Sequence, residues 1–189
     1  MNILVVYAYP NKNGLNHAIK NTVLRNIDVS HTVRVIDLYT EEFNPVLYFD
    51  KEVQRRNLYL DKETENYRKL IKQADLLIFI FPIWWSSMPA ILKGFIDRVF
   101  AKGFAYNYKG ISPIGLLKGK QAWIITTHDS PALYAKFIQK DYGRILSKQI
   151  LKMCGIRTKR QDSLPFIRES NEKKRQNFLK KIAIVSSKI

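Results

Sequence analysis

Residues 75–100 constrain the fold of this chain more than any other stretch. They begin with a continuous apolar run at 76–80, which indicates a strand buried on both faces, as in a parallel sheet. Pro82 has no backbone N–H to donate, so the strand ends there. After Pro89, which a helix tolerates in its first turn, apolar residues recur at helical spacing. A buried strand, an aromatic loop and a helix in this order predict an open α/β sheet, in which ligands bind at the carboxyl ends of the strands.

The rest of the chain alternates strands and helices in the same way. Further strands are expected at 3–8, 32–38, 121–127 and 156–167, and helices at 15–26, 61–73, 90–101, 132–154 and 171–185. Asp61 is the expected N-cap of the second helix, and the glycine-containing stretch 103–119 is expected to be a loop. The alternation implies βαβ units around one parallel sheet, in a single domain over residues 1–189.

Bulk composition limits the class of protein. The 189 residues are 46% hydrophobic and 12% aromatic, which fits one domain with a core and excludes a disordered chain. The longest apolar stretch is too short to span a bilayer, and the first residues lack a signal-peptide pattern. Cys154 stands alone, so no internal disulfide forms. We therefore expect a cytoplasmic protein that does not insert into membranes.

The formal net charge of +16 is the unusual bulk property. From residue 151 onward, 11 basic residues stand against 3 acidic ones. A basic surface can attract nucleic acid, an anionic membrane or an anionic cofactor, although a solvated basic face is the commoner explanation. Charge alone selects none of these. We expect no nucleic-acid partner, and peripheral contact with a membrane protein stays open.

A run of residues in and after the aromatic loop can be compared with known families. It comprises Phe81-Pro82, Trp85, Pro89-Ala90-Ile91-Leu92-Lys93-Gly94, Arg98-Val99-Phe100 and Phe104-Ala105-Tyr106. The run closely resembles the flavodoxin-like NAD(P)H:quinone oxidoreductases, the DT-diaphorase family and its short bacterial relatives. The resemblance covers most of residues 1–155. It implies a flavodoxin-like doubly wound sheet of five parallel strands in the order 2-1-3-4-5, with helices on both faces.

Three loops would then meet at the carboxyl edge of the sheet and form a flavin site. The first resembles the family's phosphate loop at Pro10 and Asn16, but Tyr9 replaces the usual His and Gly14 the usual Ser. Backbone N–H groups at the start of the following helix can still hold an anion, and Lys12 would assist. The residues expected to contact the cofactor here are Tyr9, Lys12, Gly14, Leu15 and Asn16. A plain polar turn is the alternative.

The second loop contributes Pro82, Ile83, Trp84 and Trp85. Two adjacent Trp in a tight loop are costly to place without a partner, since each ring needs a surface and each indole N–H an acceptor. The resemblance implies that Trp85 and the backbone of 82–84 flank the flavin ring. The alternative is that these residues belong to the core and form no site.

The third loop contributes Thr126, Thr127, His128 and Asp129. The family often has two glycines where His128 and Asp129 stand. The resemblance implies that the Thr126 hydroxyl and nearby backbone N–H groups bind the flavin ring. Tyr134 would lie over the reacting ring and stabilise charge that develops during hydride transfer. Tyr134 and His128 are the catalytic candidates, and His128 is expected to line the pocket rather than to act as a general base.

The resemblance also extends to the segments 37–39 and 43–45, which in the family lie near the partner subunit. It implies a homodimer with sites at the interface. An expected surface cluster supports this, because exposed aromatic patches commonly mark interfaces; its members are Tyr48, Phe49, Leu58, Tyr59 and Leu60. The alternative is a loop folded on its own core.

Other chemistries are not favoured. The histidines, His17, His31 and His128, pair with no Cys or carboxylate at metal spacing, so no metal is expected. The chain has no dinucleotide-binding glycine motif, no Walker lysine motif and no nucleophile elbow. A flavodoxin electron carrier fits less well, because such carriers are typically acidic and have a Thr/Ser-rich phosphate loop.

The resemblance implies a flavin-dependent NAD(P)H oxidoreductase. Hydride would pass from NAD(P)H to the bound flavin and then to a quinone or similar small electron acceptor. FMN is favoured over FAD because the longer relatives carry additional C-terminal sequence; FAD is the second choice. The alternative function is a flavin-binding ancillary subunit of a potassium-efflux transporter, with the basic C-terminal region as the contact.

Overall fold

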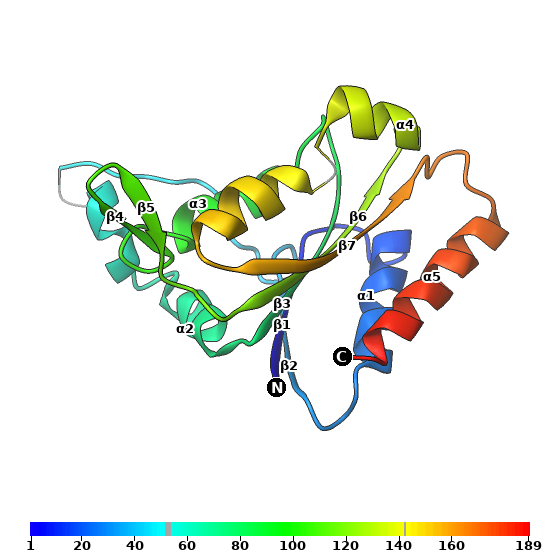
Figure 1. Cartoon of the computed structure of the whole chain (residues 1–189), viewed down its shortest axis with the longest axis horizontal. Helices are drawn as coiled ribbons and strands as arrows, with labels where there is room; N and C mark the ends of the chain where they lie inside the picture. Colours follow the sequence, from blue (N-terminus) through cyan, green and yellow to red (C-terminus); the bar gives the residue numbers. More distant parts are fainter. Residues whose placement is uncertain (52–53, 142) are drawn as a thin grey trace.

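A five-stranded parallel sheet forms the centre of the computed structural model, which describes residues 1–51, 54–141 and 143–189 (Figure 1). The strand order is β2-β1-β3-β6-β7, and every neighbouring pair is parallel. The strands are β1 Asn2–Tyr7, β2 Thr32–Asp37, β3 Leu76–Pro82, β6 Gln121–His128 and β7 Arg157–Pro165. Counting only these five strands, the order is the predicted 2-1-3-4-5, so the expected doubly wound sheet is confirmed.

Helices cover both faces of this sheet (Figure 1). On one face α1 (Leu15–Asn26) packs beside α5 (Glu172–Ser186), and on the other lie α2 (Glu65–Gln73) and α3 (Ala90–Val99). The remaining turns are the 3-10 segment η1 (Arg55–Leu60), the short α4 (Ala132–Tyr134) and the π-helical segments η2 (Ala135–Gln139) and η3 (Ile145–Leu151).

The central strand β3 supplies both cores of the molecule. All seven of its residues are buried, as the continuous apolar run predicts for a strand covered on both faces. Ile78 and Ile80 belong to the core under α1 and α5, whereas Leu77 and Phe79 belong to the core under α2 and α3. Side chains that alternate along this one strand thus contribute to the cores on both faces of the sheet.

The structure corrects three sequence-based expectations. The stretch expected as a loop contains a hairpin of β4 (Tyr106–Lys109) and β5 (Ser112–Gly115). Asp61 does not cap α2, which begins after Thr64; its carboxylate instead accepts hydrogen bonds from the Thr64 hydroxyl and Arg98. Leu58 is buried, so it is not part of the surface cluster that contains the exposed Tyr48.

The expected helical region 132–154 is helical in α4, η2 and η3, but its turns are mostly π-helical. Within the part of the chain that the structure describes, no helix is both long and apolar enough to cross a bilayer.

Candidate functional site

The three loops predicted to form a site leave the carboxyl ends of β1, β3 and β6, which are neighbours in the sheet. Main-chain hydrogen bonds fix them to one another. The Ala8 N–H donates to the Ile80 carbonyl at 3.0 Å, and the Ile83 N–H donates to the Thr127 carbonyl at 2.7 Å. The structure therefore brings the three segments to one edge of the sheet, which is where ligands bind in open α/β folds.

A buried side-chain pair ties the first loop to the third. The Asn16 amide donates to the Thr127 hydroxyl at 2.9 Å, and both side chains are buried. Sequence reasoning placed both residues in direct contact with a cofactor. In the structure their side chains bind each other, which leaves the backbone at these positions as the group available to a ligand.

The N-terminus of α1 is open to an anion. Gly14 is its N-cap, no side chain of the described residues caps it, and its first turn holds no acidic residue. The backbone N–H groups of Leu15 and Asn16 therefore add to the positive end of the helix dipole without a competing carboxylate. Lys12 is exposed in the same loop. This arrangement is typical of a phosphate site.

Tyr9 and Gly14, which differ from the residues usual in the family's phosphate loop, lie against each other. A Cβ atom on Gly14 would lie 2.7 Å from Cε1 of the Tyr9 ring, which no unshifted side chain tolerates. The Tyr9 ring in turn lies 6.3 Å from the Trp84 ring, measured between centroids, at an interplanar angle of 49°. Gly14 is thus small because Tyr9 occupies the space that a serine side chain would need.

The second loop presents Trp85 in an unusual way. Its side chain is 100% exposed, and its φ of 48° is followed by a φ of 63° at Ser86. The backbones of Trp84 and Ser87 close this turn with two hydrogen bonds of 2.9 and 3.0 Å. Positive φ at both central residues is the geometry of a type I′ turn, which Asn and Gly adopt cheaply and Trp does not. A strained turn that holds a large aromatic ring in solvent is typical of a binding surface rather than of a core.

The other members of the second loop lie elsewhere. The Ile83 side chain is buried in the core under α2 and α3, and Pro82 is buried at the end of β3. The alternative that the loop belongs to the core therefore holds for Ile83 and Pro82 and is wrong for Trp85.

Two side chains of the third loop bond to β7 and to the segment after it. Thr126 is fully buried, and its hydroxyl donates to the Ser163 hydroxyl at 3.0 Å. The Asp129 carboxylate accepts a hydrogen bond of 2.9 Å from the Arg168 backbone N–H and lies 3.5 Å from its guanidinium. Both side chains thus have partners inside the protein, although the sequence predicted that both contact the cofactor.

His128 ends β6 with a buried ring whose Nδ1 has no hydrogen-bond partner among the described residues. Burial lowers the pKa of His128 below its ordinary value, so the ring is neutral at pH 7. An unpartnered nitrogen on a neutral buried imidazole at the sheet edge can accept from, or donate to, a polar ligand group, depending on its tautomer.

Tyr134 lies half-exposed at the end of α4. The helical segment that follows is fixed to the tryptophan loop, because the Gln139 side-chain amide donates to the Ser86 hydroxyl at 2.9 Å. The sequence carried no sign of this contact between residues 53 positions apart. It sets the helix of Tyr134 next to the turn of Trp85.

A small cavity of about 230 Å³ lies beside the first loop, between it and the end of β2. Tyr7 and Asp37 are among the lining residues that sequence reasoning did not include in the site. The Tyr7 hydroxyl is buried without a partner among the described residues, and Lys20 lies over its ring while pairing with Asp37 at 2.9 Å. The only signal in the sequence was a polar-tipped residue at the end of an otherwise aliphatic strand.

Comparison with known proteins gives the family of the chain. A sequence profile described as "Flavodoxin-like fold" matches residues 1–182. An NAD(P)H oxidoreductase of Haemophilus influenzae is 35% identical over 161 residues, which cover 82% of this chain and 79% of that protein. The human ribosyldihydronicotinamide dehydrogenase [quinone] is 33% identical over 153 residues, which cover 71% of this chain and 66% of that protein.

Solved structures of other proteins share this fold. Smu.1420 from Streptococcus mutans superposes with a TM-score of 0.97 at 49% identity, covering both chains completely. A Bacillus anthracis FMN-dependent NADH-azoreductase, solved in complex with FMN, has a TM-score of 0.78 over 99% of this chain and 98% of its own, and at 16% identity it shows the shared fold alone. None of these four proteins is named as a transporter subunit, so the alternative of an ancillary transport subunit gains no support from them. The chain belongs to the flavodoxin-like family of NAD(P)H:quinone oxidoreductases.

Proposed function

We propose that this protein is an FMN-dependent oxidoreductase that passes hydride from NAD(P)H to a quinone or a similar small electron acceptor. The observation that carries the proposal is the convergence at one sheet edge of an uncapped helix N-terminus and an exposed tryptophan in a strained turn. The first suits a phosphate and the second a planar ring. FMN carries both groups, and FAD is the second choice.

The residues of the edge divide the work of holding the cofactor. The backbone N–H groups of Leu15 and Asn16 would bind the phosphate, with Lys12 adding charge. Trp85 would cover the ring, and the backbone after Thr127 would bind its polar edge. The flavin supplies the hydride chemistry when bound.

Two side chains are placed to assist the reaction. The Tyr134 hydroxyl would donate a hydrogen bond toward charge that develops on the ring, which lowers the barrier most where water is excluded. His128 would offer its unpartnered Nδ1 as a neutral hydrogen-bonding group. Because burial lowers the pKa of His128, its contribution should not change between pH 7 and pH 9.

We further propose that the protein works as a homodimer. Tyr48, Phe49, Tyr59 and Leu60 are exposed in one stretch of chain, and water-exposed apolar groups in such numbers commonly mark interfaces. A second protomer would also narrow the open side of the flavin site. A cytoplasmic location fits Cys154, whose thiol is buried and unpaired and whose pKa burial raises to about 12.

One experiment tests the proposed function directly. The purified protein is titrated with FMN and separately with FAD, and the flavin-loaded protein is then mixed with NADH or NADPH under nitrogen. We expect saturable binding of about one FMN per chain, tighter than FAD, followed by bleaching of the visible spectrum and recovery on addition of a soluble quinone. A protein that binds neither flavin, or whose bound flavin is not reduced by either nucleotide, would contradict the proposal.

A further inference from the structure

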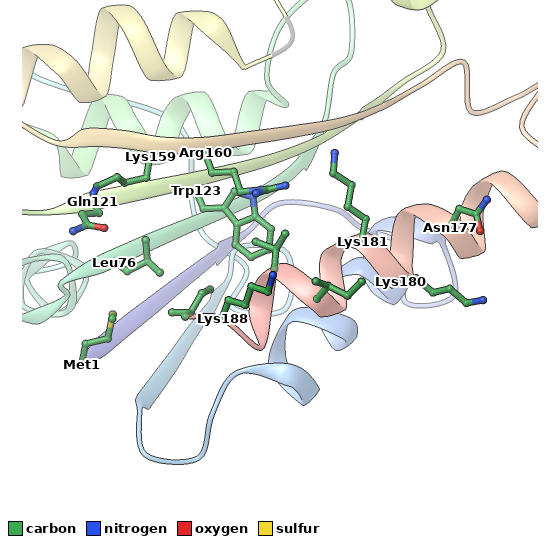
Figure 2. A pocket seen from close by; sticks show the side chains of 13 residues that line it. Met1, Leu76, Gln121, Trp123, Lys159, Arg160, Asn177, Lys180, Lys181 and Lys188 are labelled. Carbon is green, nitrogen blue, oxygen red and sulfur yellow. The ribbon is translucent and has the colours of Figure 1, made fainter.

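A second cavity lies at the opposite edge of the sheet, between the strands and α5 (Figure 2). Its volume is about 760 Å³, which lies within the range of sites that bind small molecules. The strand residues that line it include Leu76 and Gln121, the first residues of β3 and β6. The cavity is therefore at the amino ends of these strands, whereas the candidate flavin site is at their carboxyl ends.

The inner wall of this cavity is apolar and held in place. It is lined by Trp123, which is 2% exposed, by Leu76 of β3, and by Ile184 and Val185 of α5. Figure 2 shows the Trp123 ring directed from β6 toward α5. Its Nε1–H donates to the buried Asp162 carboxylate at 2.8 Å, so the polar atom of the indole is satisfied. Trp123 is itself almost fully covered, and the apolar surface open to the cavity comes from residues such as Ile184, which is 56% exposed.

The rim of the cavity is cationic. Its charged residues are Lys159, Arg160, Lys180, Lys181 and Lys188, and no carboxylate side chain is among the described residues that line it. Two adjacent residues of β7 reach the same side because the strand pairing shifts there: Ala122 pairs with Thr158 and Trp123 with Arg160, which leaves Lys159 as the extra residue of a bulge. Bulges of this kind re-aim side chains, and this one adds a cation to the rim.

Asp162 already neutralises part of this charge. Its carboxylate pairs with Arg160 and with Lys181, the latter at 2.8 Å. Burial alone would raise the pKa of Asp162, but the hydrogen bonds from these cations and from Trp123 hold it below its usual range, so the carboxylate stays ionised. No ion pair of the described residues involves Lys159, Lys180 or Lys188. Figure 2 shows the Lys180 side chain directed away from the Trp123 ring. Lys159 and Lys188 are therefore the rim cations that we consider for a further anion.

We propose that this cavity binds a single-chain anionic amphiphile, a medium-chain carboxylate, with its hydrocarbon body against Ile184 and Val185 and its headgroup at Lys159 and Lys188. The apolar wall favours the hydrocarbon by removing its surface from water, and the two lysines provide charge complementarity for the carboxylate. A neutral or cationic molecule of the same length would gain from burial of its hydrocarbon but not from the charge of the lysines. Because the cavity and the flavin site lie at opposite edges, occupancy of one does not require the other.

Isothermal titration of the full-length protein with decanoate, well below its micellar concentration, tests the proposal. The titration is run with and without saturating FMN, and decanol serves as the neutral control of equal length. We expect about one decanoate per chain in both conditions, and binding about tenfold weaker for decanol, since it lacks the charge. Equal affinity for decanol, no saturable binding, or loss of decanoate binding when FMN is present would each overturn the proposal, the last because the ligand would then occupy the flavin site.

Matched variants locate the site. Lys159→Glu and Lys188→Glu should each weaken decanoate binding by about tenfold or more, because they reverse a charge that contacts the headgroup. Lys188→Arg should retain binding. Lys173→Glu makes the same change of charge on α5 outside the cavity and should stay within about twofold of the parent. The lysines are exposed, so the fold should survive, and circular dichroism checks it.

The control variant also gives the refuting outcomes. If Lys173→Glu weakens binding as much as Lys188→Glu, the anion is attracted by the overall charge of the protein. It is then not bound in the cavity, and the proposal is wrong. If the protein binds vesicles that contain phosphatidylglycerol but not monomeric decanoate, the rim faces a membrane surface and the proposal is wrong.

Discussion

Replacing Trp85 with glycine should separate the stability of the fold from the affinity for flavin. The Trp85 side chain is 100% exposed and its φ is 48°, so the substitution removes no buried contact and relieves a left-handed backbone. That conformation costs an ordinary residue about 1–2 kcal/mol. Glycine avoids this cost, but it loses more backbone freedom on folding, which destabilises the folded state by about 0.5–1 kcal/mol. The free energy of unfolding should therefore stay unchanged or rise by up to about 1.5 kcal/mol.

The effect on flavin affinity should have the opposite sign. A tryptophan side chain carries roughly 150–250 Å² of surface, and a ring stacked on one face would bury about half of it. At about 25 cal/mol per Å² this amounts to ~2.5 kcal/mol, less the roughly 0.5–1.5 kcal/mol needed to order the side chain. The net loss of about 1–2 kcal/mol corresponds to an FMN dissociation constant about 5–30-fold higher.

Two measurements check this pair of effects: urea unfolding of the flavin-free protein, and titration of FMN followed by quenching of its fluorescence. Trp85→Tyr is the matched control, since it keeps an aromatic ring at the same left-handed position and leaves the Ser86 hydroxyl in place. We expect that control to bind FMN within about twofold of the parent. A loss of more than about 2 kcal/mol in stability for Trp85→Gly would show that the ring packs on the protein, and an unchanged FMN affinity would remove Trp85 from the site.

Three further predictions test individual side chains. Tyr134→Phe removes one hydrogen-bond donor and should slow bleaching of the flavin by NAD(P)H about tenfold, or about 1.4 kcal/mol; an unchanged stopped-flow rate constant would exclude Tyr134 from catalysis. Gly14→Ser should cost about 1 kcal/mol of stability, because its side chain displaces the Tyr9 ring, and in a Tyr9→His background the same change should cost nothing; equal costs in both backgrounds would show that the two positions are independent. Asp162 has a lowered pKa in the folded state, so its contribution to stability is present at neutral pH and is lost as the pH falls through that value. Asp162→Asn should therefore be less stable than the parent at pH 7, and its stability should fall less than that of the parent between pH 7 and about pH 3. Urea unfolding at the two pH values measures both effects. Identical changes of stability with pH in the variant and the parent would contradict this role of Asp162.

The sequence predicted the strands of the sheet well, because their signals are local. The seven residues of β3 are apolar without interruption and end at Pro82, and helix α1 begins and ends where its apolar spacing does. The hairpin of β4 and β5 was missed because each strand has only four residues and its support is distant. A Cβ atom on Gly115 would lie 2.3 Å from the backbone of Cys154, and no local pattern records that contact.

The candidate site was predicted at the level of loops and not of side chains. The order of strands in a doubly wound sheet determines which loops meet, so the loops after β1, β3 and β6 could be placed from the sequence. The partners of Asn16 and Thr126 are residues 111 and 37 positions away. The directions of the Thr126 and Thr127 hydroxyls depend on such distant partners. The sequence alone does not show which residues these partners are.

The close approach of Gly14 to the Tyr9 ring bears on how the loop at residues 9–16 could have evolved. A tyrosine at position 9 in its present orientation and a serine at position 14 compete for the same space, so an ancestor with the family's usual His and Ser that acquired the tyrosine first would have to hold that ring in another position. An order in which glycine at position 14 comes first, or together with the tyrosine, avoids this shift. Relatives that carry His at the first position and Gly at the second are therefore the expected intermediates, and those with Tyr and Ser should be rare.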